Sequence, residues 1–285
     1  MFLCANQLII MTKRIFLSLG ITVLCIGIAN AQKIAVTKGQ KLETTSTSKM
    51  TMEVMGQNID NETNATSQAE VKSVNDNGFV FANTLKRMFI KGSAMGQDIN
   101  FDSDKKEDMD GQMGQVLKSR IGVEKEITVD RLGKISDTKD TAAKAAGGMS
   151  DIMNVAGDLS KGQPYPILIQ LPGRNIKPGD SWTDSIGTAE TLKTVTTYTL
   201  KGINSDGVAV SFTGTVARSG TIQQQGIEIQ MDITGTVKGD ATYETATGLL
   251  KRNDSSSEIS GTMGVMGQNA PITMKMTVTT LGKRI

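Results

Sequence analysis

The residues best placed for chemistry are methionines that lie two positions apart. Met50 and Met52 form one such pair, and Met274 and Met276 form another near the C-terminus. Residues i and i+2 of a β-strand point to the same face, so each pair would present two sulfur atoms side by side. Thioethers are ligands for Cu(I), but they also fill irregular gaps in apolar surfaces. Both pairs alternate with polar residues, so the methionines lie on the apolar face of each predicted strand. We therefore interpret them as packing residues and assign no metal ligand.

The methionine content favours an adaptable apolar surface. Residues 32–285 contain 14 methionines and only nine aromatic residues. Unbranched, polarizable side chains of this kind line pliable pockets for apolar ligands, although they also occur in loosely packed cores. We therefore predict a surface that lines an apolar ligand and is formed by Met50, Met52, Met231, Met274 and Met276.

The absence of histidine removes most hydrolase chemistry. The 285 residues include no His, so Ser-His-Asp and Cys-His pairs, HExxH zinc sites and His-ligated haem are all excluded. The chain also has no P-loop, no GxGxxG and no GxSxG motif. We assign no catalytic residue, no cofactor and no metal ligand, and we expect a protein that is not an enzyme.

Three weaker motifs have ordinary explanations. The acidic run from Asp102 to Asp110 lacks the closing carboxylate of a calcium loop, so we interpret it as a solvated loop. Ser46-x-x-Lys49 and Ser103-x-x-Lys106 match the nucleophile motif of penicillin-interacting enzymes, but no SDN or KTG element accompanies them. A glycosidase-like pair of acids would need an aromatic-lined cleft. Because few aromatic residues are present, a glycosidase is the least favoured alternative.

The N-terminal segment has the pattern of a secretory signal peptide. Lys13 and Arg14 precede an apolar run at 15–28, and Ala29-Asn30-Ala31 supplies the small residues that signal peptidase recognises. The run is shorter than the roughly 20 residues of a membrane-spanning helix. We predict cleavage after Ala31, a periplasmic or secreted location, and no transmembrane segment after cleavage.

The predicted mature chain is electrically neutral and lacks cysteine. Segment 1–31 carries both cysteines, two basic residues and no acidic residue, so 29 basic and 29 acidic residues remain. A neutral chain has no long-range attraction for phosphate backbones or anionic lipid, and we expect no nucleic-acid partner. A fold without disulfides in an oxidising compartment needs a substantial core, which suits the periplasm of a Gram-negative bacterium.

Strand patterns dominate the rest of the sequence. Apolar and polar residues alternate along 42–54, and the same period of two recurs at 208–216, 227–237 and 272–278. Such alternation is typical of antiparallel sheets with one solvated face. Turn signals at 75–78, 131–134, 204–207 and 246–248 separate the strands. We predict a mainly β (α+β) fold of antiparallel curved sheets, with one or two packed helices.

The domain organisation follows from the prolines and from two segments that break the β pattern. Low β-propensity predicts helices near 107–120 and 141–159. Four of the five prolines lie at positions 164, 166, 172 and 178, where they oppose both helix and strand. We therefore predict a signal peptide at 1–31, an N-terminal β-rich half at 32–162, a Pro-rich junction at 163–178 and a C-terminal antiparallel half at 179–285.

Several short motifs together resemble an uncharacterised protein family. They are the Met-Gly-Gln turn after the first strand, Phe101-Asp102-Ser103, the stretch 129–135, Leu171-Pro172, Gly179-Asp180-Ser181-Trp182 and Thr247-Gly248-Leu249. The order of these motifs resembles secreted, β-rich envelope proteins of Bacteroidota-type bacteria with a domain of unknown function. That resemblance implies no catalytic or binding residue. The predicted architecture also resembles periplasmic lipid carriers of the lipoprotein-chaperone kind, although a fold does not fix a function.

These observations lead to two functional hypotheses. The first is a non-catalytic periplasmic or surface envelope protein that binds a hydrophobic ligand, such as a lipid, or a protein partner of the envelope. It predicts an enclosed cavity lined by the five methionines named above. The alternative is a structural or adhesive β module without a ligand cavity, whose function lies on its Thr-rich outer faces.

Overall fold

The fold consists of long antiparallel strands, which account for most of the chain. The computed structural model describes residues 33–285 except 55, 95–96, 140–158, 160, 188–192, 225–226 and 266–267. Its strands are β1 (Lys41–Val54), β2 (Gln57–Asn75), β3 (Gly78–Ala94), β4 (Gln97–Asp102), β5 (Glu124–Asp130), β6 (Ile135–Lys139), β7 (Ser181–Ile186), β8 (Lys193–Asn204), β9 (Gly207–Gln224), β10 (Ile227–Tyr243), β11 (Leu250–Val265) and β12 (Gln268–Arg284). The described helices are α1 (Lys106–Asp110) and α2 (Gln112–Leu117).

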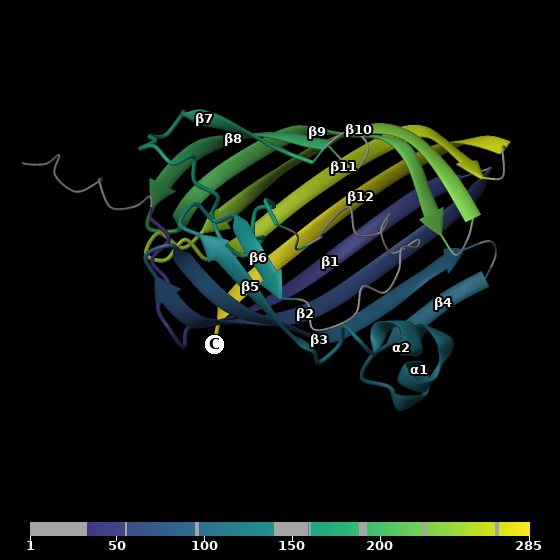
Figure 1. Ribbon diagram of the computed structural model, residues 1–285, viewed down its shortest axis with the longest axis horizontal. Coiled ribbons are helices and arrows are strands. Elements are labelled where there is room, and N and C mark those ends of the chain that lie inside the picture. The colour runs from purple at the N-terminus through teal and green to yellow at the C-terminus, as the bar shows by residue number, and fades with distance from the viewer. Residues whose placement is uncertain are drawn as a thin grey trace, which may run out of the picture. The chain divides into compact units, whose positions relative to one another are not determined.

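All twelve strands belong to one sheet. Its order is β6-β5-β3-β2-β1-β12-β11-β10-β9-β8-β7, and β4 pairs with β3 beside this path. The first and last strands pair along almost their whole length, from Leu42 opposite Arg284 to Val54 opposite Ile272. The mainly β, antiparallel prediction is confirmed, and the two predicted β-rich halves are parts of a single continuous sheet (Figure 1).

The predicted turns connect the strands as hairpins. Asn75 accepts hydrogen bonds through its Oδ1 from the backbone N–H groups of Asn77 and Gly78, at 2.9 and 3.1 Å. Asn204 repeats this arrangement in the β8–β9 turn, with Asp206 and Gly207 as donors. Asn favours such turns because its side chain replaces a missing backbone partner.

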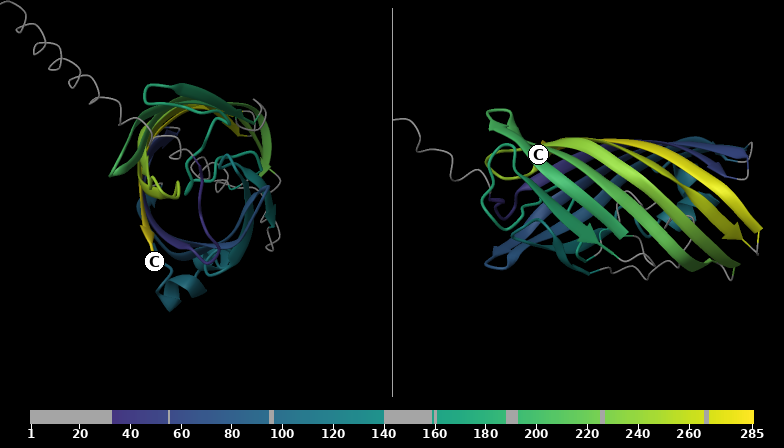
Figure 2. Two further views of the ribbon diagram at one scale, coloured as in Figure 1. Left: turned by 90° about the vertical axis from the view of Figure 1, so that its left-hand side faces the viewer. Right: turned by 90° about the horizontal axis from the view of Figure 1, so that it is seen from above.

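The sheet curves strongly, and glycines on its inner face permit the curvature. In Figure 2 the strands wind around a concave inner face. A Cβ atom added at Gly235 would lie 2.4 Å from the carbonyl oxygen of Glu258 on β11, and one added at Gly239 would lie 2.4 Å from that of Asp254. Strands approach this closely only where a side chain is missing, and glycines at such positions let a sheet bend.

The Pro-rich stretch crosses the concave face of the sheet. We call residues 161–180 the strap. Its backbone bonds first to the β5–β6 turn, through Tyr165 N–H to the carbonyl of Gly133, and then to the β10–β11 turn, through Ile169 N–H to the carbonyl of Gly248. Leu168 also bridges to Leu249. Because the strap joins turns that lie far apart in the sheet, it holds the curve closed at this end.

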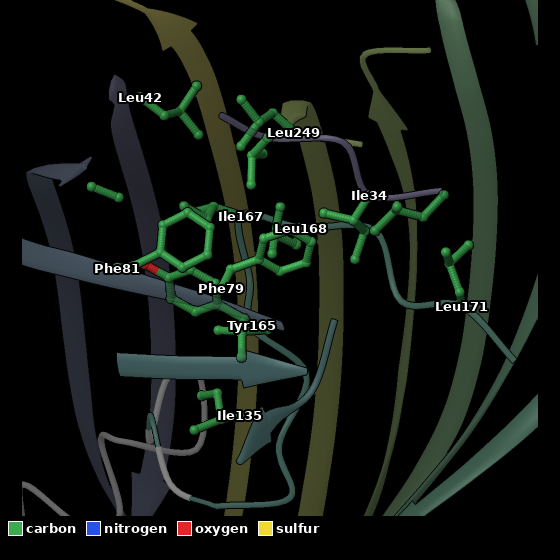
Figure 3. Close-up of a cluster of buried hydrophobic side chains, with 14 of the residues drawn as sticks. Ile34, Leu42, Phe79, Phe81, Ile135, Tyr165, Ile167, Leu168, Leu171 and Leu249 are labelled. Carbon is green, nitrogen blue, oxygen red and sulfur yellow. The ribbon is translucent and has the colours of Figure 1, made fainter. Parts of the chain in front are cut away.

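A large buried cluster forms around the strap. We call it the aromatic cluster, and Figure 3 shows part of it. The rings of Phe81 and Tyr165 lie 5.0 Å apart, and Trp182 stacks on Tyr198 at 5.6 Å. Its buried members are Ile34, Val36, Leu42, Ala69, Val71, Phe79, Phe81, Ile127, Val129, Ile135, Tyr165, Ile167, Leu168, Ile169, Leu171, Ile176, Trp182, Leu200, Val208, Val210 and Leu249. Trp182, the one tryptophan of the chain, is therefore a core residue.

The two described helices are short and superficial. Together they occupy the region of the helix predicted near 107–120, and Gly114 is the one residue of the pair that is buried. The helix predicted at 141–159 and the signal peptide predicted at 1–31 lie outside the described residues, apart from Leu159. Within the described residues, none of the helices has the length and apolar character needed to cross a membrane.

Candidate ligand-binding face

A second buried cluster occupies the concave face at the opposite ends of the strands. We call it the methionine cluster. It comprises Met50, Met52, Val54, Ile59, Ile229, Met231, Ile233, Ile259, Ile272 and Met274, with Met263 and Met276 packed against it. All five methionines predicted from the sequence are therefore brought together by the fold, four of them as buried members.

Strand register explains why the methionines meet. Met50 lies directly opposite Met276, and Met52 lies opposite Met274, across the β1–β12 pair. Met274 in turn lies opposite Ile259 on β11. Directly paired residues point to the same face of a sheet, with Cβ atoms about 5 Å apart. Two sequence-distant Met-x-Met motifs thus form one patch of four thioether side chains.

A polar stretch separates the two clusters along the strands. On β1 the inward positions between Leu42 and Met50 are Thr44, Ser46 and Ser48, all half-buried. On β11 the buried Ser257 lies opposite Met276, and its Oγ has no hydrogen-bond partner. The inner face therefore changes from aromatic, through small polar, to methionine-rich side chains.

One charged side chain accompanies the methionine cluster. Arg218 on β9 lies directly opposite the buried Ile233 of β10, two residues after the buried Val216. Strand alternation consequently directs Arg218 to the concave face. Its Nε atom is buried and has no hydrogen-bond partner. Arg218 is not among the predicted site residues, although the period of two continued beyond Val216 places it on the apolar face.

A second inward charge, Asp184 on β7, is fully engaged. Its Oδ1 accepts a bond from Lys134 Nζ at 2.5 Å, and its Oδ2 accepts one from Gln170 Nε2 at 2.9 Å. Lys134 belongs to the β5–β6 turn and Gln170 to the strap, so this contact links the two edges of the sheet through the strap. Asp184 thus has a structural role among the described residues.

The structure also contains two open depressions, with volumes of about 560 and 580 Å³. The residues that line the first include Met50, Ser257 and Met276. Those that line the second include Val216, Ile259 and Met274. Neither depression is enclosed, and the enclosed cavity expected for a ligand remains a prediction.

The weaker motifs of the sequence are occupied by structural contacts. Asp102 accepts hydrogen bonds from Arg87, which hold the pKa of its carboxyl below the usual range, assisted by the backbone N–H of Asp104. The carboxylate of Asp108 accepts a bond from the backbone of Asp102. Ser46 bonds to Thr280. Within the described part of the chain, no group of three acidic residues is arranged to hold a metal ion.

Comparison with known sequences identifies one similar domain. A family of unknown function, DUF6263, matches residues 161–250. This segment contains the strap, strands β7 to β10 and the β10–β11 turn, and it includes Arg218. The match confirms the predicted resemblance to an uncharacterised domain over this part of the chain. No curated protein matches the chain significantly.

Comparison with solved structures identifies distant similarities. A structure of lipovitellin, described in terms of lipid–protein interactions, aligns with a TM-score of 0.52 and 10% identity over 87% of this chain and 25% of the other. An outer membrane channel of Pseudomonas putida aligns with a TM-score of 0.27, 7% identity, and coverage of 90% and 100%. The lipovitellin similarity concerns the fold alone, and this chain spans about a quarter of the lipovitellin chain.

Proposed function

We propose that this chain is a non-catalytic protein that binds a hydrophobic ligand, of the lipid class, on the concave face of its sheet. The observation that carries the proposal is the methionine cluster, in which two Met-x-Met motifs lie opposite each other. Polarizable, flexible side chains on an inward face suit an apolar ligand of variable shape. The fold similarity to lipovitellin supports the proposal, since the printed description of that protein concerns its interactions with lipid.

The proposed site of action is the periplasm or the surface of a Gram-negative bacterium of the Bacteroidota type. This part of the proposal rests on the predicted signal peptide at 1–31 and on the resemblance to secreted envelope proteins. Cleavage after Ala31 can be tested, because the processed protein would begin at Gln32. N-terminal sequencing of protein exported from the cell would give Gln32 as the first residue.

The test of ligand binding is native mass spectrometry. The full chain is expressed with its own N-terminal segment, and the exported protein is purified gently and measured before and after solvent extraction. We expect a mass above that of the polypeptide, and an apolar molecule in the extract. A bare polypeptide mass that does not change after incubation with bacterial lipid extract would contradict the proposal.

Matched variants localise the binding. Met52→Gln with Met274→Gln places two polar side chains in the methionine cluster and is expected to remove the bound lipid. Lys49→Gln with Lys275→Gln changes neighbouring residues that point outward, and is expected to leave lipid binding intact. Equal binding by both double variants would show that the ligand does not contact the concave face.

The alternative function is a structural or adhesive module that uses the outer face. The specific observation in its favour is a row of outward hydroxyl pairs, in which Ser181 bonds to Thr199 at 2.8 Å and Thr183 bonds to Thr197 at 2.9 Å. An ordered polar face of this kind suits contact with another envelope protein. The bare mass described above would favour this alternative.

A further inference from the structure

Arg218 is an unusual residue for the face on which it lies. Directly paired residues on neighbouring strands form rows across the inner face, and three adjacent rows contain Met231, Ile233 and Ile259. Among the described residues of these rows, Arg218 is the one that carries a charge. Its directly paired neighbour Ile233 and its strand neighbour Val216 are both buried. An arginine here can pack its apolar stem on these neighbours, but its guanidinium loses part of its hydration.

No described group compensates the charge of Arg218. Its Nε atom is buried without a hydrogen-bond acceptor, and none of the described carboxylates forms an ion pair with it. The adjacent Asp232 of β10 is exposed on the outer face, between the inward Met231 and Ile233. Asp184, the other inward charge on this side of the sheet, is already engaged by Lys134 and Gln170. Arg218 is half-buried and its desolvated Nε has no acceptor, which favours an anionic partner that comes from outside the described residues.

We infer that Arg218 binds the oxyanion of an amphiphilic ligand whose apolar chain lies along the methionine cluster. This inference rests on the proposed lipid-binding function and specifies its ligand class. The planar guanidinium is suited to a carboxylate or a phosphate, because it can donate two parallel hydrogen bonds to either.

The arrangement of the strands gives the chain of such a ligand a continuous apolar path. Arg218 is on β9, and Met50 and Met52 are on β1, which lies four strand positions away in the order β9-β10-β11-β12-β1. At about 4.8 Å per strand this corresponds to roughly 19 Å across the sheet. The path crosses Ile233 on β10, Ile259 on β11 and Met274 on β12. A long acyl chain anchored at Arg218 would therefore extend across the cluster as far as β1.

The test compares three probes that share an apolar chain and differ in head group. Exported full-length protein is stripped of bound lipid and titrated with palmitate, with palmitoyl lysophosphatidic acid and with neutral hexadecanol. We expect an anionic probe to bind more tightly than hexadecanol. Arg218→Gln is expected to weaken binding of that anionic probe by about 10- to 100-fold, and to leave hexadecanol binding unchanged. A larger effect on palmitate assigns a carboxylate ligand, and a larger effect on the phosphate probe assigns a phospholipid ligand.

Three further variants separate charge from folding. Arg218→Lys keeps the charge and is expected to restore part of the selectivity, whereas Lys238→Gln removes an exposed outward cation of β10 and is expected to change nothing. The unliganded Arg218→Met variant should unfold at the same temperature as the parent or higher, because an unmatched charge is removed from an apolar face. Equal binding of all three probes, unaffected by Arg218→Gln, would overturn the inference and leave the proposed function standing. If none of the probes bound, both would fail.

Discussion

The two buried clusters on the concave face differ in composition and in how they are held. The aromatic cluster combines Phe79, Phe81, Tyr165 and Trp182 with aliphatic residues, and the strap lies among them, fixed by backbone hydrogen bonds. The methionine cluster contains no aromatic residue, and its described members come from strands alone. The two clusters share strands β1 and β2, and on β1 small polar residues such as Ser46 and Ser48 separate them.

This difference indicates that the two clusters have different roles in one sheet. Rigid aromatic rings with defined packing contribute strongly to stability, and the strap supplies the backbone partners that fix them. Methionine side chains are flexible and specify packing less precisely. We therefore assign the stability of the fold mainly to the aromatic cluster, and the proposed ligand binding to the methionine cluster.

The largest expected effect is the loss of Tyr165 from the aromatic cluster. Tyr165→Ala removes a fully buried ring that contacts Phe81, and we expect a decrease of about 3–5 kcal/mol in the free energy of unfolding. Denaturant titration measures this change. The matched control is Tyr165→Phe, which should be neutral or stabilising, because the hydroxyl of Tyr165 is buried without a hydrogen-bond partner. A small loss in Tyr165→Ala would contradict the assigned role of the cluster.

A smaller loss is expected at Gly235, where the curved strands approach closely. The Cβ of Gly235→Ala would lie 2.4 Å from the Glu258 carbonyl oxygen, so β10 and β11 must separate, at a cost of about 1–3 kcal/mol. Gly202→Ala is the control, because a Cβ there meets no atom within 4 Å. Equal thermal stability of the two variants would show that the curvature does not depend on this contact.

The pH dependence of stability should report on the aromatic cluster, because all three tyrosines lie in it or pack against it. Burial raises the pKa of Tyr198 to about 12, with a contribution from the charge of Asp184, and burial also raises the pKa values of Tyr165 and Tyr243. An unfolded tyrosine titrates near 10. Between pH 10 and 12 the folded state keeps protons that the unfolded state releases, so stability is fully present below pH 10 and falls as the pH rises.

Tyrosinate absorbance followed against pH, together with denaturant midpoints, measures this effect. We expect no tyrosine to titrate near pH 10 in the folded protein, and a falling midpoint above that pH. Normal titration of even one tyrosine would contradict the packing described for the aromatic cluster.

The smallest stability change is expected in the methionine cluster. Met52→Leu and Met274→Leu conserve volume and should each change the free energy of unfolding by about 1 kcal/mol or less. If either variant lost as much stability as Tyr165→Ala, the methionine cluster would be a rigid core like its counterpart, and the assignment of different roles would be wrong.

The strands, turns and methionine patch could be predicted because their signals are local. Alternation along 42–54 and 272–278 identifies two strands with methionine faces, and turn residues such as Asn75 and Asn204 identify the hairpins. The pairing of β1 with β12 could not be predicted, since it joins residues about 230 positions apart in the sequence and local patterns do not carry that information. The single sheet follows from that pairing.

The contacts of the strap and the role of Arg218 could not be predicted, for different physical reasons. Prolines exclude regular hydrogen bonding, which predicts a junction at 163–178 but not the backbone bonds, such as that of Ile169, that join two distant turns. Arg218 continues the alternation of Val208 to Val216, but a charged residue ends an apolar pattern when only residue type is considered. The buried neighbours of Arg218 and the absence of an acceptor for its Nε among the described residues become visible only once the strands are paired.

The most direct test of lipid binding by the methionine cluster is methyl NMR of the protein labelled with carbon-13 at its methionine methyl groups. Palmitate is added to lipid-free, exported protein, and each methyl signal is assigned by single Met→Leu substitutions. We predict that the signals of Met50, Met52, Met231, Met274 and Met276 shift together, while that of Met113, which is exposed on α2, does not. Unchanged signals for the five cluster methionines at saturating palmitate would contradict the account.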